Sequence, residues 1–386
     1  MKKLLLLLFF AVSCSRVIVV ENPLDVDRSA EMVACPAPAG NYRLVDAQGQ
    51  EVPYQITHDG QLIFQASVPA LGKVEYRLLR GTPAPVDTVA VGSLRPDRLD
   101  DIIWENDRSG WRMYGPGTHA AGQKVFGYDV FTKSVPYPVM KDRFDKDHNH
   151  ASWEQIAGWR EQGLDARADS LLHAISFHVD HGDGMDVYTV GASLGCGTAA
   201  LLDSAGRLDF PWCWERYTIL DNGPLRFRVK VVMDGGQETR IITCDAGSWF
   251  NTVELDYAAL SSTYSVISSE AAGVVEKSIP IAAGIVLHDS HPDAYVSGPG
   301  YIGYADLGDP NPGTNGEIYC GVVLPGAGEA RVEQGHILLP STWEPGFTYW
   351  FGSSWSKGGI PSLSAWSELL EREVRLRENP LKISFR

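Results

Sequence analysis

The stretch RYTILDNGPLRFRVKVVMDGGQETRIITCDAGSWFNTVELDY, residues 216–257, constrains the fold most strongly. It consists of short β-rich runs separated by turns at Asn222-Gly223, at residues 234–236 and at residues 245–247. Such spacing predicts four antiparallel strands joined by tight turns. Apolar side chains alternate in the second run, which predicts one buried face, at Phe227, Val229, Val231 and Met233.

The same strand-and-turn pattern extends over most of the chain and predicts an all-β protein. Residues 16–90 resemble a small N-terminal β-sandwich module, and residues 91–386 a large antiparallel β-sandwich. Helical patterns are confined to residues 153–172 and to a C-terminal helix at 364–379, capped by Ser364. Because strands and helices do not alternate, a doubly wound sheet is disfavoured.

The N-terminus has the pattern of an export signal. Lys2 and Lys3 precede an apolar run over residues 4–12, which is too short to span a membrane. Cys14 occupies the place of a lipidated cysteine, although Ala11 departs from the usual leucine. We therefore expect residues 1–15 to be a lipoprotein signal peptide with its lipidation site. The mature protein would be a periplasmic or outer-membrane lipoprotein of a Gram-negative bacterium, anchored to the membrane only through Cys14.

Charge and cysteine content narrow the possible partners. The net charge is −15, which argues against nucleic acid, although a few local cations could still bind an acidic substrate. Five cysteines follow Cys14, and no pair has C-x-x-C spacing, so a structural zinc site is not expected. Their odd number and wide spacing suggest small buried residues with at most one or two disulfides.

The segment HVDHGDGMDVY, residues 178–188, is the densest group of proton-handling side chains. Asp183-Gly184 is typical of a two-residue hairpin turn. In that register His181 pairs with Asp186 and shares a face with Tyr188, while His178 points the other way. A three-residue loop would break this grouping.

This hairpin predicts acid–base chemistry. A carboxylate beside a histidine fixes its tautomer and tunes its basicity, and a perturbed tyrosine can exchange protons. Two other interpretations stay open. The cluster could be a structural hydrogen-bond network, or it could hold Ca²⁺ or a transition ion through Asp180, His181, Asp183 and Asp186. No known metal-loop spacing is matched, so no metal ligand is assigned and the cofactor remains unknown.

The segment WENDRSGWRMYGPG, residues 104–117, is the second candidate site. Trp104 and Trp111 could stack on sugar rings, and Asn106 could bind hydroxyls. Arg112 could bind a carboxylate with both nitrogens. An exposed loop with an Arg–carboxylate bridge explains the segment equally well. Lys133 adds a further cation.

Four segments together resemble the bacterial domain-of-unknown-function family 4861: WENDRSGWRMYGP, GYDVFTK, FHVDHGDGMDVYTVGASLGCGTAAL and ILDNGPLRF. The resemblance covers most of residues 100–375 and departs at Asp183, where glutamate is common. It implies a galactose-mutarotase-like β-supersandwich. It also implies an exported carbohydrate-active enzyme, similar to oligosaccharide dehydratases of ulvan breakdown.

The implied reaction eliminates water across C4–C5 of a terminal uronate and leaves a 4,5-unsaturated uronyl residue. This reaction on an oligosaccharide substrate requires three groups of the protein: a base, an acid and a cation. We assign the base to His181, oriented by Asp186, and the acid that protonates O4 to Tyr188. Asp183 is a further catalytic candidate. Arg112 or Lys133 would neutralise the substrate carboxylate. The remaining candidates for substrate binding are Asn106, Trp104, Trp111 and His178.

Three other functions fit the same residues. A polysaccharide lyase would perform the same elimination with a sugar as the leaving group. A glycoside hydrolase would need paired carboxylates, such as Glu105 with Asp183. A non-catalytic glycan-binding lipoprotein would depend on Trp104 and Trp111 but not on His181.

Overall fold

The computed structural model describes residues 16–211, 213–257, 279–308 and 314–386. The chain divides into two compact units. The first comprises residues up to Asp87 together with Asn379–Arg386, and the second comprises Thr88–Glu378. Cys14 and the expected signal peptide lie outside the described residues.

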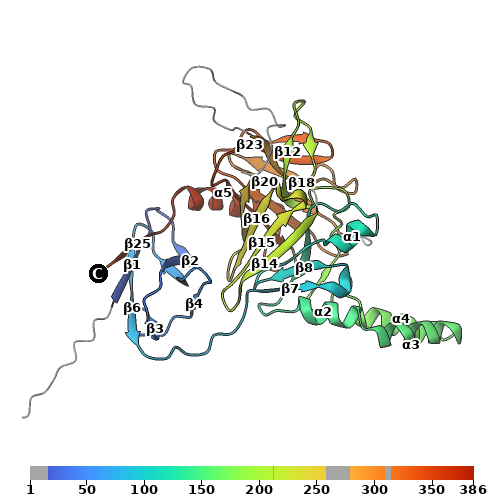
Figure 1. Cartoon of the computed structure of the whole chain (residues 1–386), viewed down its shortest axis with the longest axis horizontal. Helices are drawn as coiled ribbons and strands as arrows, with labels where there is room; N and C mark the ends of the chain where they lie inside the picture. The colour runs from blue at the N-terminus through green and yellow to red at the C-terminus, as the bar shows by residue number, and fades with distance from the viewer. Residues whose placement is uncertain (1–15, 212, 258–278, 309–313) are drawn as a thin grey trace, which may run out of the picture. The chain divides into compact units, whose positions relative to one another are not determined.

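Two antiparallel sheets form the first unit (Figure 1). A four-stranded sheet has the order β25-β1-β6-β3, and a three-stranded sheet has the order β2-β5-β4. Ile18, Phe64 and Leu78 are buried in the core between them. The strands are β1 (Arg16–Glu21), β2 (Arg28–Pro36), β3 (Tyr42–Val45), β4 (Tyr54–Ile56), β5 (Gln61–Val68), β6 (Lys73–Arg80) and β25 (Lys382–Phe385).

The C-terminal strand β25 completes this first unit. The sequence pattern had placed all of residues 91–386 in the large β-sandwich. β25 pairs antiparallel with β1, so that Val19 lies opposite Ser384. An unpaired β1 would leave a row of backbone amides and carbonyls without partners at the sheet edge. The return of the chain end supplies those hydrogen bonds.

The second unit contains an eight-stranded antiparallel sheet of order β14-β15-β16-β17-β24-β21-β20-β19. The four expected strands of residues 216–257 form its first half, and the alternating residues from Phe227 to Met233 are buried as predicted. The strands are β14 (Trp214–Asn222), β15 (Arg226–Met233), β16 (Thr239–Asp245), β17 (Phe250–Asp256), β19 (Tyr295–Gly298), β20 (Tyr301–Asp306), β21 (Ile318–Val323) and β24 (Thr348–Trp355).

Two five-stranded sheets complete the second unit, with orders β11-β10-β9-β8-β7 and β13-β12-β18-β23-β22. Trp104, Val229 and Ile281 come from the three different sheets and share one core. The all-β fold class is therefore confirmed. The strands are β7 (Val91–Arg95), β8 (Asp101–Glu105), β9 (Gly110–Met113), β10 (Tyr128–Lys133), β11 (Gly184–Asp186), β12 (Cys196–Leu202), β13 (Leu208–Asp209), β18 (Ile279–Val286), β22 (Arg331–Glu333) and β23 (His336–Trp343).

The C-terminal helix α5 (Leu363–Glu378) is confirmed to within one residue. It covers β20 and β21, and Trp366 and Leu370 enter the core beneath it. Its cap differs from the prediction, because the Ser362 hydroxyl, and not Ser364, accepts the hydrogen bond of the Ala365 amide at 3.2 Å. No helix among the described residues is long and apolar enough to cross a membrane.

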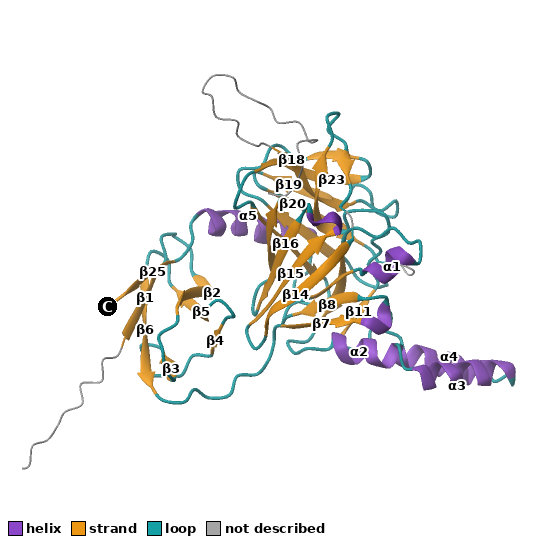
Figure 2. Ribbon diagram, viewed as in Figure 1, coloured by secondary structure: helices purple, strands orange, loops and turns teal. Residues whose placement is uncertain are grey.

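The remaining helices exceed the prediction. The expected helical region at residues 153–172 forms a hairpin of α3 (His150–Glu161) and α4 (Asp165–Ile175), side by side in Figure 2. Two shorter helices were not expected from the sequence, α1 (Pro116–Ala120) and α2 (Met140–Asp147). α1 begins with proline at its first position, where a missing N–H costs no hydrogen bond.

Candidate functional site

The predicted hairpin at Asp183-Gly184 does not form, and this interpretation is corrected. Gly184 begins strand β11 and lies opposite Lys133 of β10. The Asp186 amide bonds to the Phe177 carbonyl at 2.9 Å, so His181 is not the partner of Asp186. Gly184 is required by close packing, because its φ is +123° and a β-carbon there would lie 1.8 Å from the Thr132 carbonyl oxygen.

His181 and Tyr188 consequently lie in different environments. His181 is exposed, and its ring packs edge-on against His173 with centroids 5.7 Å apart. Tyr188 is only 4% exposed and belongs to the main core. Burial raises the pKa of Tyr188 well above its ordinary value, with a further contribution from Cys320. A phenol in that state is a poor match for an acid that must protonate O4 near neutral pH.

The other members of this segment shape the loop. The Arg143 guanidinium binds the Asp183 carboxylate at 2.7 Å. The Asp180 carboxylate accepts the amide of Gly182 at 2.8 Å, and the His178 ring bonds to the Asp186 carbonyl. Partial burial, followed by the nearby Arg143, lowers the pKa of His181. Within the described ranges no group of three His, Cys, Asp or Glu side chains is arranged to hold a metal ion.

Three of the residues predicted to bind sugars are buried and make contacts within the protein. Trp104 and Trp111 are 1% and 0% exposed inside the core, so neither offers a face for stacking. The Asn106 side chain donates to the carbonyls of Asp245 and Ser248, both at 2.7 Å. These three side chains therefore position the β8–β9 connection.

Lys133 is also buried. Its ammonium contacts the Glu105 carboxylate at 2.6 Å and donates to the Asn106 carbonyl at 2.6 Å. Glu105 in turn accepts the amides of Val139 and Met140 at the start of α2. This ion pair fixes α2 onto the sheet, which explains why the sequence pattern of α2 alone did not predict a helix.

Arg112 and Asp186 do come together, in a buried ionic cluster on neighbouring strands of the β7–β11 sheet. We define the Arg112 cluster as Arg112, Tyr114, Asp101, Asp129 and Asp186. Arg112 lies 3.1 Å from the Asp186 carboxylate and 3.8 Å from that of Asp101, and forms a short ion pair with Asp129. The carboxylate partners of Arg112 thus belong to the protein itself.

Ionisation in this cluster is strongly perturbed. Burial raises the pKa of Asp186 to about 7, although Arg112 opposes the shift. Burial likewise raises the pKa of Asp101 to about 6. Three carboxylates surround one guanidinium, so the low-dielectric interior favours keeping a proton on one of them.

A cleft of about 810 Å³ lies beside this cluster, between α1 with the segment that follows it and the β13–β14 region. Apart from Pro116, its lining residues lie outside the motifs recognised in the sequence, so this cleft was not predicted. Its lining consists of Pro116, His119, Gly122, Gln123, Lys124, Phe126, Leu208, Asp209, Phe210, Cys213, Trp214 and Glu215.

Aromatic and charged groups share this cleft. The rings of Phe126 and Phe210 are stacked with centroids 5.3 Å apart. His119 Nε2 donates to the Val125 carbonyl at 3.1 Å, because a carbonyl can only accept. The neutral ring therefore carries its lone pair on Nδ1, as a general base requires. Lys124 is an exposed cation in the same lining.

Tyr114 links the cleft to the Arg112 cluster. Its hydroxyl donates to Asp129 at 2.7 Å and accepts from Arg112 at 2.8 Å. It also lines a small cavity of about 10 Å³, whose walls include Phe126 and Trp214 from the cleft. In addition, the Asp101 carboxylate accepts the Gly115 amide immediately before α1 at 3.0 Å. The cluster thus supports one wall of the cleft.

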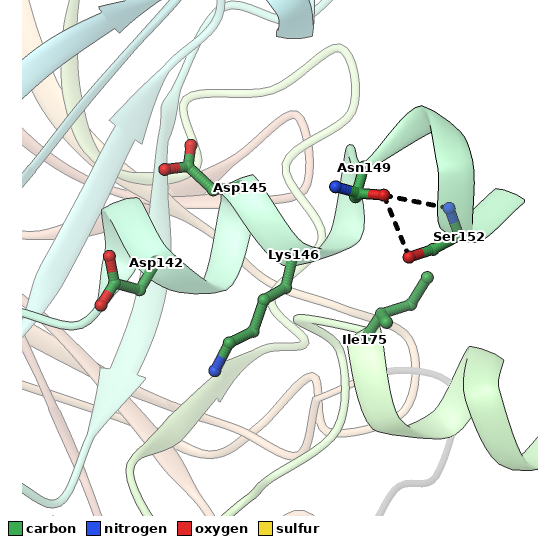
Figure 3. A pocket seen from close by; sticks show the side chains of 6 residues that line it. All are labelled: Asp142, Asp145, Lys146, Asn149, Ser152 and Ile175. Carbon is green, nitrogen blue, oxygen red and sulfur yellow. Dashed lines mark hydrogen bonds between the residues drawn. The ribbon is translucent and has the colours of Figure 1, made fainter.

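A second hollow, of about 400 Å³, lies on helices α2 to α4 (Figure 3). Its lining includes Asp142, Asp145 and Lys146. The side-chain oxygen Oδ1 of Asn149 accepts from the amide and hydroxyl of Ser152, which is the capping pattern of α3. Helix capping and surface ion pairs account for most polar groups of this hollow, and we assign no function to the hollow.

Comparison with known proteins gives a family match over nearly the whole chain. The model described as "Domain of unknown function (DUF4861)" matches residues 20–383. "Uncharacterized protein P7" of Formosa agariphila is 23% identical over 303 residues, covering 66% of this chain and 70% of that protein.

Two solved structures from Enterococcus faecalis are also similar. One is an α-mannosidase, with a TM-score of 0.42, and the other is a protein in glycosyl hydrolase family 38, with a TM-score of 0.41. Each is 8% identical, and the alignments cover 96% of this chain. The chain spans about half the length of these two proteins, 46% and 47%.

Proposed function

The chain belongs to the DUF4861 family, and on that premise we propose that it is an exported carbohydrate-active enzyme whose substrate binds in the α1–β14 cleft. The proposed reaction is the dehydration of a uronate at the non-reducing end of an oligosaccharide. The observation that carries the proposal is the placement of His119 and Lys124 beside the stacked rings of Phe126 and Phe210.

Each group matches a requirement of the elimination. Aromatic faces pack against the C–H face of a pyranose ring. The Lys124 ammonium would neutralise the uronate carboxylate and so acidify the C5 proton, an electrostatic effect often worth about 10²–10³ in rate. His119 Nδ1 would accept that proton.

A single residue, His119, can carry out both proton transfers of this reaction. The C5–H electrons form the C4–C5 double bond while the C4–O bond breaks. The His119 imidazolium then returns its proton to the departing O4, so that water leaves and the ring is restored. Proton transfer of this kind typically contributes about 10²–10⁴ in rate.

The test compares His119→Ala with His181→Ala on uronate-ended oligosaccharides, measured by ultraviolet absorbance and mass spectrometry. The wild type should produce an absorbing product that has lost one water at unchanged chain length. We expect His119→Ala to lower kcat by a factor of about 10²–10⁴ and His181→Ala to keep the kcat of the wild type. The reverse result would assign the base to His181 and contradict the proposal that the α1–β14 cleft is the active site. His150→Ala, on the exposed surface of α3, is the control.

The substrate cation is tested separately. Lys124→Ala should raise KM and lower kcat for a uronate but have little effect on a methyl-esterified analogue, whose carboxyl is already neutral. Lys141→Ala is a matched control, because that lysine is exposed on α2 and pairs with Asp145. Equal losses on both substrates would remove Lys124 from this role.

Binding without catalysis is the second candidate, favoured by the aromatic wall of the cleft. In that case calorimetry would detect oligosaccharide binding that Phe126→Ala abolishes, with no change in mass. Shortened products would instead indicate a lyase if they absorb in the ultraviolet, or a hydrolase if they do not.

We also propose that the protein is anchored as a lipoprotein through Cys14. Radioactive palmitate should label the wild type in a Gram-negative host and fail to label Cys14→Ala. A label that persists in the variant, or is absent from both proteins, would contradict this anchor.

A further inference from the structure

Strand β14 extends from the cleft to an open edge of the eight-stranded sheet. It is the first strand in the sheet order and pairs with β15. Trp214, at its start, lines the cleft, and residues 215–218 that follow are exposed. The described residues of the sheet leave the other side of β14 without a partner strand.

A β-bulge places Tyr217 on the same face as Trp214. The pairing register runs from Trp214 opposite Met233 to Tyr217 opposite Val231, with a shift between Trp214 and Arg216. Met233 and Val231 both face the core. Without the extra residue of the bulge, side chains three positions apart would point to opposite faces.

Tyr217 continues the aromatic wall of the cleft outward. Its ring centroid lies 5.4 Å from that of Trp214, with an angle of 71° between the rings. Trp214 is 4% exposed, whereas Tyr217 is 38% exposed. The buried indole therefore supports an exposed phenol ring next to the cleft.

The same wall includes an unused hydrogen-bond donor. The Trp214 indole nitrogen is buried and makes no hydrogen bond to any residue that the structure describes. A buried donor without a partner costs free energy, which a ligand oxygen or a bound water can recover. The unpaired donor belongs to the ring that supports Tyr217, although the nitrogen itself is not exposed to solvent.

We infer that Tyr217 forms a second sugar subsite, which stacks on the sugar next to the uronate held in the α1–β14 cleft. This inference rests on the proposed function and adds a substrate class: oligosaccharides whose second sugar reaches β14. The sugar on Tyr217 belongs to the same oligosaccharide as the uronate, because the ring of Tyr217 is continuous with the cleft through Trp214.

The experiment measures kcat and KM for wild type, Tyr217→Ala and Tyr217→Phe on the methyl glycoside of the uronate, which has no second sugar, and on uronate-ended di-, tri- and tetrasaccharides. Tyr217→Ala should raise KM about three- to tenfold for chains long enough to reach Tyr217, with kcat and the shortest substrate unchanged. Tyr217→Phe should retain most of the affinity. Tyr295→Ala is the matched control, because Tyr295 is also 38% exposed but lies on β19, at the opposite end of the sheet order.

The outcomes separate this inference from the proposed function. If turnover occurs and Tyr217→Ala changes KM equally at all lengths, or not at all, the subsite is wrong and the function stands. If no chain loses water, calorimetry with the same chains tests the subsite alone, and equal or undetectable binding by wild type and variant overturns it. A change of sedimentation in Tyr217→Ala would identify a protein interface and also overturn it.

Discussion

The Arg112 guanidinium lies 3.1 Å from the Asp186 carboxylate inside the second unit, and both side chains are almost fully buried. Asp101 and Asp129 approach the same guanidinium. Because one cation is surrounded by three carboxylates, the free energy of unfolding should depend on the protonation of this cluster and on the presence of Arg112. Two predictions follow from this arrangement.

The first prediction concerns pH. The pKa of Asp186 in the folded protein is about 7, because of burial, and its ordinary value is 3.8. Between these values the folded state keeps a proton that the unfolded chain has released. The contribution of Asp186 to the free energy of unfolding is therefore present below pH 4 and decreases as the pH rises to about 7.

Urea unfolding of wild type and Asp186→Asn at several pH values checks this prediction. The stability difference between the two proteins should shift in favour of Asp186→Asn as the pH rises from 4 to 7, since an amide cannot ionise. Asp169→Asn, on the exposed surface of α4, should follow the wild type. Parallel curves for wild type and Asp186→Asn would contradict the raised pKa.

The second prediction concerns Arg112 itself. Arg112→Ala leaves three buried carboxylates without their cation, and breaking a buried pair typically costs about 3–5 kcal/mol. Urea unfolding near pH 7 should show this loss. Arg160→Ala removes a surface pair, in which Arg160 and Asp169 are both exposed, and should cost less than about 1 kcal/mol. Equal losses would mean that the cluster is not what stabilises this sheet.

The third prediction concerns Lys133, whose ion pair with Glu105 holds the start of α2. Lys133→Met leaves a buried carboxylate unpaired and should cost about 3–5 kcal/mol of stability. Any protein that remains folded should keep the KM of the wild type, because Lys133 is buried and its ammonium is bound by Glu105 and by the carbonyls of Asn106 and Tyr137. A selective rise in KM for acidic sugars would restore its predicted role in substrate binding.

Sequence patterns predicted the parts of the fold that local rules determine. Strand alternation and glycine turns are local, so β14 to β17 were predicted. The pairing of β25 with β1 joins opposite ends of the chain, and α2 begins where Glu105 accepts its first amides. No short pattern contains either relationship.

The candidate site was less predictable for the same reason. The cleft combines His119 and Lys124 with residues about 90 positions later, such as Phe210 and Trp214. Arg112 and Asp129, in the segments that carry the family resemblance, contact Tyr114, which lines a small cavity next to the cleft. Composition and spacing could not distinguish a buried Arg–carboxylate cluster from one that faces a ligand.

The fourth prediction compares Gly184, which was assigned to a hairpin turn, with the nearby Gly182. Gly182 and Gly184 both have positive φ, +93° and +123°. A β-carbon at Gly182 meets nothing within 4 Å, whereas one at Gly184 would lie 1.8 Å from the Thr132 carbonyl oxygen. Gly182→Ala should therefore cost only the backbone strain, about 1–2 kcal/mol. Gly184→Ala must also displace β11 from β10 and should cost several kcal/mol more or prevent folding. Thermal unfolding of both variants checks this, and equal midpoints would mean that β11 does not pack against β10 at this position.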